Sequence, residues 1–188
     1  FLGIGEVSNM AGVALCVPLA NKIGKKSTFI LVNAALVVFS IAFFFVPCTS
    51  EGYWTMLVLQ IIISIFTGIM SPLVWSMYAD VSDYAELKFH TASTGLIFSS
   101  ASMAQKFGGA IGGAAVLWLL SGFGYNTDAS TTAGIVQPES ALMVLRWLMS
   151  FIPAAVAAFA IVVVWFYPLT TKRIHEISVE LKKFREIE

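Results

Sequence analysis

The sequence predicts an all-α membrane protein with five transmembrane helices. Of its 188 residues, 58% are hydrophobic and 12% are charged, which is about half the charged fraction of a soluble domain. A helix crosses the hydrocarbon core with about 20 apolar residues. Five segments have that length and character, and they lie near residues 1–20, 28–47, 54–78, 92–121 and 141–167. The strands of a membrane β-barrel are about 10 residues long and alternate in polarity, so these segments exclude a barrel.

The separators between these segments are short and polar, which predicts turns or loops. They read NKIGKKST, PCTSEGY, ADVSDYAELKFHT and GYNTDASTTAGIVQPES. Lys and Arg occur in alternate separators and in the tail, whereas the stretches 48–53 and 122–139 contain neither. Because short cytoplasmic loops are enriched in Lys and Arg, this asymmetry predicts a cytoplasmic C-terminus and an outside position for the residue-1 end.

The first predicted span begins in the middle of an apolar pattern. Phe1 is not preceded by an initiator methionine or a basic segment, so the span is not a signal peptide. With an outside start, five spans predict that at least one helix precedes them and that the chain is a fragment of a longer protein. Glu6 shares a helix face with Asn9, and two interpretations stay open for it: an ion pair with Lys106, or a position near the outer surface.

The third predicted span carries a polar stripe, whose members recur every three or four residues and therefore share one helix face. The stripe consists of Gln60, Ser64, Thr67, Ser71, Trp75 and Tyr78, and Gly68 and Pro72 are expected to interrupt the helix nearby. An aromatic ring beside hydroxyls and an amide suits a sugar. The alternative is that Trp75 and Tyr78 belong to the aromatic belt of the membrane interface.

Three acidic residues follow this span at helical spacing, namely Asp80, Asp83 and Glu86. Like charges on one helix face repel, so we expect cationic partners, with Lys22, Lys25, Lys26 and Lys88 as the candidates. Ion pairs between Asp80, Asp83 and Glu86 and the residues Lys25 and Lys26 would form a cytoplasmic gate. A solvated loop is the alternative.

The fourth predicted span holds Lys106 near the middle of a long apolar run. A charge at the centre of a membrane helix costs about 2.5–3.5 kcal/mol, so its face is expected to line protein or a water-filled cavity. That face comprises Ser99, Ser102, Lys106, Gly109 and Gly113. Lys106 either binds a polar substrate or neutralises a cation-binding acidic cluster, or it forms a structural ion pair. The glycines at 108, 109, 112 and 113 predict close helix packing.

The tail, residues 168–188, is predicted as an amphipathic helix that follows the transmembrane bundle of residues 1–167. Ile174, Ile177, Leu181 and Phe184 recur at helical spacing, and charged residues cover the other face. Such a helix lies on the membrane surface, packs under the bundle, or is a solvated tail.

Other functional classes lack support in the sequence. The net charge of +0 does not indicate a nucleic-acid partner. The two histidines and two cysteines do not have metal-ligand spacing, and Cys16 and Cys48 lie at different predicted depths, so a disulfide is not expected. No catalytic triad or phosphate-binding loop is present. We therefore expect no enzymatic activity, no bound cofactor and no metal site in this chain.

The most specific motif is a spaced series between residues 79 and 125, which consists of ADVSDYAE at 79–86, GLIFS at 95–99, AQKFG at 104–108 and Gly124–Tyr125. YPLT at 167–170 and the basic turn IGKK at 23–26 accompany it, although the basic turn alone would be a weak signal. Together these motifs resemble those of the glycoside–pentoside–hexuronide:cation symporter family of the major facilitator superfamily. The resemblance covers almost the whole chain. It implies a twelve-helix fold of which this chain supplies helices eight to twelve, in the C-terminal half.

The resemblance also implies a function, which is uptake of a sugar or glycoside coupled to Na⁺ or H⁺ across the bacterial inner membrane. The family lysine that matches Lys106 faces a central cavity near the sugar and cation sites, and the acids that match Asp80 and Asp83 belong to a cytoplasmic charged network. We expect the cavity to receive Lys106, Ser102 and Gln105 from one helix and Gln60, Ser64, Thr67 and Trp75 from another. The expected partners are the sugar or glycoside, the lipid bilayer and the missing N-terminal half of the transporter. The alternative is a non-transporting membrane assembly or receptor subunit.

Overall fold

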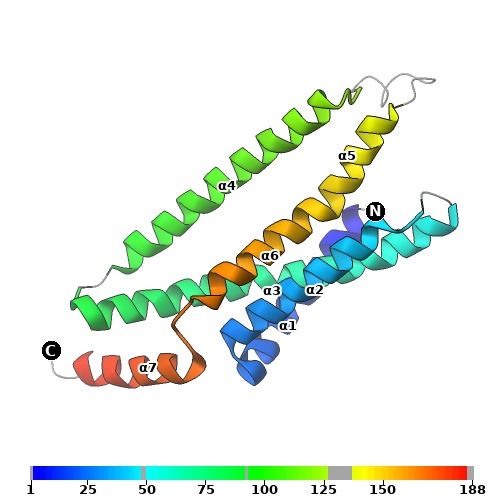
Figure 1. The fold of residues 1–188 in the computed structure, drawn as a ribbon. Coiled ribbons are helices and arrows are strands. Elements are labelled where there is room, and N and C mark those ends of the chain that lie inside the picture. Colours follow the sequence, from blue (N-terminus) through cyan, green and yellow to red (C-terminus); the bar gives the residue numbers. More distant parts are fainter. Residues whose placement is uncertain (1, 48–49, 92, 127–136, 186–188) are drawn as a thin grey trace.

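The computed structural model describes residues 2–47, 50–91, 93–126 and 137–185, and every regular element in these ranges is a helix. The elements are α1 (Leu2–Ile23), α2 (Lys25–Phe44), α3 (Ser50–Phe89), α4 (Thr94–Gly122), α5 (Glu139–Met149), α6 (Phe151–Trp165) and α7 (Thr171–Arg185). Five helical stretches of the described residues are long and apolar enough to span a membrane, with α5 and α6 together forming the last. The predicted all-α membrane fold is confirmed (Figure 1).

Two predicted loops are shorter than expected. The turn at NKIGKKST reduces to Gly24 between α1 and α2, with a φ of +86° that favours glycine. The segment ADVSDYAELKFHT is helical up to Phe89, because its residues 79–89 contain neither Gly nor Pro to end the helix. At about 1.5 Å per residue, the 40 residues of α3 are twice as long as the hydrocarbon core is thick, so α3 projects from the membrane. The predicted loop between α4 and α5 falls largely outside the described residues.

The last predicted span is divided at Ser150, where α5 ends and α6 begins. The Ser150 hydroxyl donates a hydrogen bond of 2.5 Å to the carbonyl oxygen of Arg146. Pro153, three residues on, has no N–H to offer the carbonyl of Met149, and its ring crowds that carbonyl. This proline explains why the first helix stops at Met149.

The closest helix contact joins α1 to α3 at Gly12 and Gly68. A β-carbon at Gly12 would overlap the backbone carbonyl of Ile65, and one at Gly68 would overlap the backbone carbonyl of Asn9. Both positions therefore need glycine for the backbones to touch. The expectation that Gly68 and Pro72 interrupt the third span is wrong, since α3 is continuous through both residues.

A hydrophobic core lies where α1, α2 and α3 meet near the end of the bundle that carries Lys22, Lys25 and Lys26, called here the lysine-rich end. Its buried members are Cys16, Phe29, Val32, Ile69, Leu73 and Met77, and partly buried side chains of α6 pack against it. The tail helix α7 packs against α3 at the same end, and Leu169, Ile177 and Leu181 are buried. The side chain of Phe184, predicted to share this face, lies outside the described residues.

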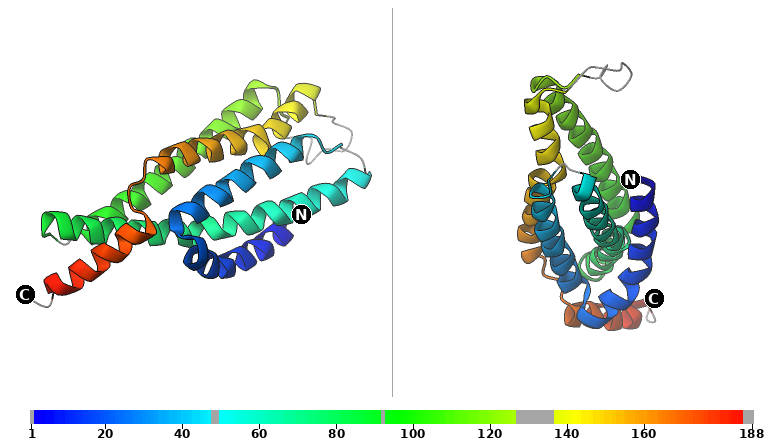
Figure 2. Two further views of the ribbon diagram at one scale, coloured as in Figure 1. Left: turned by 60° about the horizontal axis from the view of Figure 1, so that its bottom comes forward. Right: turned by 90° about the vertical axis from the view of Figure 1, so that its right-hand side faces the viewer.

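Helix α4 stands apart from this core. Its element contacts are with α3 and α5, and none of its residues is buried. Figures 1 and 2 show α4 meeting α3 at the lysine-rich end and drawing away from it toward the opposite end, where it lies near α5. The predicted close packing of glycines 108, 109, 112 and 113 is not formed by the described residues, since a β-carbon at each would meet open space. Among the described residues, one face of α4, which is long enough to span a membrane, therefore packs against no other helix.

The α1–α3 contact gives the first prediction. Gly68→Ala forces a methyl group against a backbone carbonyl, so it is expected to lower the stability of the protein by about 1–3 kcal/mol. Gly12→Ala should act in the same way. Thermal unfolding of the detergent-solubilised protein, followed by loss of its monodisperse chromatographic peak, measures the effect. Gly122→Ala is the matched control because its β-carbon has no neighbour within 4 Å, and an equal loss in this control would contradict the explanation.

Candidate functional site

The polar stripe of α3 is present in the structure and borders two cavities. A cavity of about 190 Å³ between α1 and α3 is lined by Gly5, Glu6, Asn9, Gln60, Ile63, Ser64 and Thr67. A cavity of about 520 Å³ between α3 and α4 is lined by Thr67, Met70, Ser71, Val74, Trp75, Tyr78, Ala101, Ala104 and Gln105. Thr67 borders both, so one helix face joins them. Hydroxyl, amide and indole groups thereby come together along a single path.

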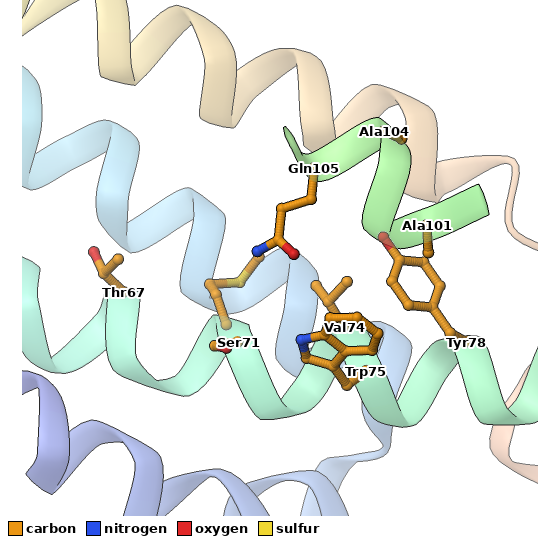
Figure 3. A pocket seen from close by; sticks show the side chains of 9 residues that line it. Thr67, Ser71, Val74, Trp75, Tyr78, Ala101, Ala104 and Gln105 are labelled. Carbon is orange, nitrogen blue, oxygen red and sulfur yellow. The ribbon is translucent and has the colours of Figure 1, made fainter. Parts of the chain in front are cut away.

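The larger cavity combines aromatic and polar walls, as Figure 3 shows. The Trp75 ring stacks on Phe98 of α4, with ring centroids 5.8 Å apart and an interplanar angle of 17°. The Tyr78 ring meets Trp75 edge-on at 5.7 Å. Gln105 extends from α4 toward α3. An aromatic face with hydroxyls and an amide at its rim is the surface that a sugar ring needs.

The smaller cavity brings Glu6 next to the polar stripe. The Gln60 amide donates to the Ser64 hydroxyl at 3.3 Å, and a β-carbon at Gly5 would lie 3.1 Å from that hydroxyl oxygen. Glu6 and Asn9 face the same space. Within the described part of the chain Glu6 has no ion pair with Lys106, so the first of its two interpretations is not realised there.

Lys106 is exposed and does not line either cavity. Its neighbour Gln105 faces α3, and successive residues on a helix are turned by about 100°, so Lys106 points to another side of α4. Ser102, one turn before it, also lies outside the lining of both cavities and is partly exposed. Among the described residues Lys106 has no ion-pair partner. The structure brings Gln60, Ser64, Thr67, Trp75 and Gln105 along one path, and places Lys106 and Ser102 on the uncovered face of α4.

A charged cluster joins α2 to α3 at the lysine-rich end. The Lys25 ammonium lies 2.7 Å from both carboxylate oxygens of Asp80 and 3.4 Å from the Ser76 carbonyl oxygen. The Asp80 side chain is 8% exposed, against 28% for Lys25. This ion pair links two helices of one bundle and is shielded from solvent on its acidic side.

The other two acids of this helix face, Asp83 and Glu86, are partly exposed, and the ion pair of Lys25 is formed with Asp80. The predicted pairing of Lys26 with an acid is not formed in the described residues, and it stays a prediction. The Lys26 ammonium donates instead to the carbonyl oxygens of Trp165 at 2.8 Å and Tyr167 at 2.7 Å. Carbonyls at a helix C-terminus lack intrahelical donors and carry partial negative charge, so they attract the lysine.

Tyr167 is a member of this cluster that the sequence reasoning did not single out. Its hydroxyl donates to the Met77 carbonyl at 3.4 Å. Burial, reinforced by the negative charge of Asp80, raises the pKa of the Tyr167 hydroxyl above its usual value, so the hydroxyl keeps its proton. The sequence did contain a signal for Tyr167, because this residue begins the YPLT motif shortly after α6 ends at Trp165. A second contact, 2.7 Å between the hydroxyls of Ser82 and Thr94, connects α3 to the start of α4.

The Lys25–Asp80 pair gives the second prediction. Lys25→Met leaves a buried carboxylate without its cation, so it is expected to destabilise the protein by about 3 kcal/mol. Asp80→Asn should cost less, because the remaining ammonium is the more exposed partner. The double variant should be more stable than the sum of the two losses predicts.

Chemical or thermal unfolding of the solubilised protein measures these three stabilities. Lys22→Met provides the control, since Lys22 is exposed on the same end of the bundle. Strictly additive losses in the double variant would show that the ion pair does not contribute.

Comparisons with known proteins identify the family of the chain. Residues 1–171 match the family described as MFS/sugar transport protein. The chain is 32% identical to a glucuronide carrier protein homolog of Escherichia coli K12 over 97% of its length, and 32% identical to the inner membrane symporter YicJ of the same organism over 96%. It is 30% identical to the putative glycoside/cation symporter YagG, also of Escherichia coli K12, over 98% of its length. No solved structure matches the chain.

The chain spans 38–39% of the length of these relatives. The family match covers more than nine tenths of the chain, and it agrees with the motifs at 79–86, 95–99 and 104–108. These relatives are transporters, and the five apolar helices fit a multi-pass membrane protein. The chain therefore belongs to the MFS/sugar transport protein family, as a glycoside:cation symporter-type member of the major facilitator superfamily.

Proposed function

We propose that this chain forms part of a secondary transporter that moves a sugar or glycoside together with Na⁺ or H⁺ by alternating access. The observation that carries the proposal is Lys106, which lies within a membrane-length helix on a face that the described residues leave uncovered. At about 1.5 Å per residue, Lys106 is about 18 Å from the start of α4 and 24 Å from its end. Because α4 is about 13 Å longer than the hydrocarbon core is thick, Lys106 lies about 12 Å and 18 Å from the two boundaries of the core when the helix is centred, which is further than a lysine side chain extends.

The position of Lys106 requires a hydrated or polar neighbour. An ammonium facing lipid at this depth costs about 2.5–3.5 kcal/mol, so the uncovered face of α4 is expected to meet another part of the protein. The relatives are about 2.5 times longer than the chain, and we propose that their additional segment, the N-terminal half, provides that surface. A cavity between two halves is the arrangement that alternating access needs.

Within that cavity we assign separate roles to the two polar helix faces. Lys106 and Ser102 contribute from the uncovered face of α4, and Gln105 contributes from its α3-facing side. Gln60, Ser64 and Thr67 provide hydrogen-bonding groups along α3, with Trp75 as the flat apolar surface for the sugar ring. Gln60, Ser64, Thr67, Trp75 and Gln105 line the two neighbouring cavities along α3, whereas Lys106 and Ser102 would complete the site from the uncovered face of α4. Coupling then requires that cation binding favours the sugar-binding state, and the effect is reciprocal.

We place the lysine-rich end in the cytoplasm, because the separators at that end carry the Lys and Arg residues of the loops. There the cluster of Asp80, Asp83, Glu86, Lys25 and Lys26 is proposed as a cytoplasmic gate. Lys25 and Asp80 hold α2 to α3, and Lys26 holds α2 to the end of α6. These contacts fix the projecting part of α3, which presents Asp83 and Glu86 to the opposing half.

Uptake by the full-length protein tests the role of Lys106. Lys106→Ala is expected to reduce cation-driven accumulation of a glycoside by at least about tenfold, because loss of a buried charge contact costs on the order of 2–5 kcal/mol. Expression should be retained, since the side chain is exposed within this chain. The measurement is accumulation of a labelled glycoside such as a glucuronide, with and without Na⁺ and at two external pH values.

Lys172→Ala serves as the matched control, because it removes one lysine from the exposed start of α7. The control should transport normally. Unchanged accumulation and unchanged cation dependence in Lys106→Ala would remove Lys106 from the mechanism.

Solvent access distinguishes a transporter from the alternative, a non-transporting assembly or receptor subunit in which the polar faces are sealed. A cysteine at Ser102 in a cysteine-free background is expected to react with a membrane-impermeant maleimide, because a cavity admits water. A cysteine at Ile111, which is 67% exposed and is turned by about 180° from Ser102 on the same helix, is the control for lipid-facing positions and should react slowly. Equally slow labelling at both positions, in the presence and absence of glycoside and Na⁺, would favour the sealed subunit.

A further inference from the structure

The small cavity between α1 and α3 is lined by oxygen-bearing side chains around one carboxylate. Most of its lining residues carry such groups, namely Glu6, Asn9, Gln60, Ser64 and Thr67. Carboxylate, amide and hydroxyl oxygens therefore border a volume of about 190 Å³. Pockets for small organic ligands measure about 300–1,000 Å³, so this cavity is better matched to an ion with some of its water than to a sugar ring.

Two hydrogen-bond donors at this cavity are already engaged within α3. The Gln60 amide donates to the Ser64 hydroxyl at 3.3 Å, and the Thr67 hydroxyl donates to the Ile63 carbonyl at 2.8 Å. The lone pairs of these amide and hydroxyl oxygens are left as acceptors. Glu6 forms no hydrogen bond or ion pair with any other described residue. A space rich in acceptors, beside a carboxylate without a partner in the described chain, favours a cation.

Helix α3 shows how deep Glu6 lies. The predicted third span begins near residue 54, and Trp54 is 68% exposed, as is typical of an aromatic residue at the membrane boundary. Gln60 and Ser64 follow Trp54 along the unbroken helix by about 9 Å and 15 Å. A β-carbon at Gly5 would lie 3.4 Å from the Gln60 amide nitrogen and 3.1 Å from the Ser64 hydroxyl oxygen, so Glu6 is near the same level. That level is inside a hydrocarbon core of about 30 Å, where a carboxylate requires a compensating charge.

We propose that this cavity binds one Na⁺ ion through the Glu6 carboxylate. Its further ligands are the side-chain oxygens of Asn9, Gln60 and Ser64. One monovalent cation neutralises one carboxylate, whereas a divalent cation would leave an uncompensated charge at membrane depth. Histidine and cysteine spacing does not predict such a site, because hard cations take oxygen ligands.

This inference rests on the proposed function and divides its polar stripe between two ligands. The part of the stripe that faces α1 binds the cation, and the part that faces α4, with Trp75 and Gln105, binds the glycoside. Thr67 borders both cavities, so the two ligands would lie next to each other. Binding of one can then change the affinity for the other through a shared residue.

Binding of radioactive Na⁺ to the purified full-length protein, in the absence of glycoside, tests this site. Glu6→Gln removes the charge and keeps the shape of the side chain, so it is expected to weaken Na⁺ binding at this site by at least about tenfold. At a subsaturating Na⁺ concentration for the variant, the number of ions bound per molecule should fall by one. Glu6→Asp should restore part of the affinity. Ser64→Ala removes one neutral ligand and should weaken binding by about fivefold.

Glu139→Gln is the matched control, because Glu139 is an exposed acid at the start of α5, outside this cavity. This control should bind Na⁺ as the wild-type protein does. A monodisperse chromatographic peak checks that each variant folds, and Ser64→Ala keeps the test decisive if Glu6→Gln does not fold.

Two outcomes would overturn the proposal. Unchanged affinity and stoichiometry of Na⁺ in folded Glu6→Gln or Ser64→Ala would show that the cavity does not bind Na⁺. If Glu6→Gln binds Na⁺ normally and loses only the pH dependence of glycoside uptake, Glu6 carries a proton instead. Failure of the proposed symport is distinguishable, since a wild-type protein that accumulates no glycoside can still show Na⁺ binding that depends on Glu6.

Discussion

The close crossing of α1 and α3 is the contact on which the remaining structure depends. At Gly12 and Gly68 each helix presents bare backbone to a carbonyl of the other, and van der Waals packing of this kind stabilises helix pairs in lipid, where the hydrophobic effect does not draw helices together. The crossing positions the polar stripe of α3 against Glu6 and Asn9 on one side and α4 on the other. It also orients the projecting end of α3, which carries Asp80 and supports α7. Helix α3 therefore contributes residues to both cavities and to the ion pair.

Charges at the lysine-rich end act as connectors in this arrangement. Lys25 and Lys26 are adjacent in sequence, but consecutive helical residues point about 100° apart, so one reaches Asp80 and the other reaches the end of α6. A turn with Gly24 at positive φ permits this geometry, and the Thr171 side chain at the start of α7 occupies the space that a β-carbon there would fill. Helices α2, α3, α6 and α7 thus meet around two ammonium groups, each supplied with oxygen acceptors.

Much of the fold could be predicted from the sequence, because hydropathy reports length and burial in lipid directly. The five spans and the tail helix follow from apolar runs and helical periodicity. Periodicity does not show where a helix continues or stops. The sequence analysis therefore did not predict the extension of α3 to Phe89 or the break at Ser150. For the site, spacing identified the polar stripe of α3, yet it could not choose between Lys25 and Lys26 as the partner of Asp80. The partner of Lys106 could not be predicted either, since the described residues do not contain one.

Cations in or beside the apolar helices face one electrostatic problem. A charge loses hydration as it enters the membrane, and that loss must be offset by oxygen ligands or water. Lys25 receives a carboxylate from the neighbouring helix. A long side chain close to a membrane boundary can instead reach the headgroup layer, so depth alone reduces the cost of its charge. Lys106 has neither solution within the described chain, because it is too deep to reach either interface and α4 has no buried face. Its offset must come from groups outside the described helices, so the uncovered side of α4 is where we propose that the rest of the transporter packs.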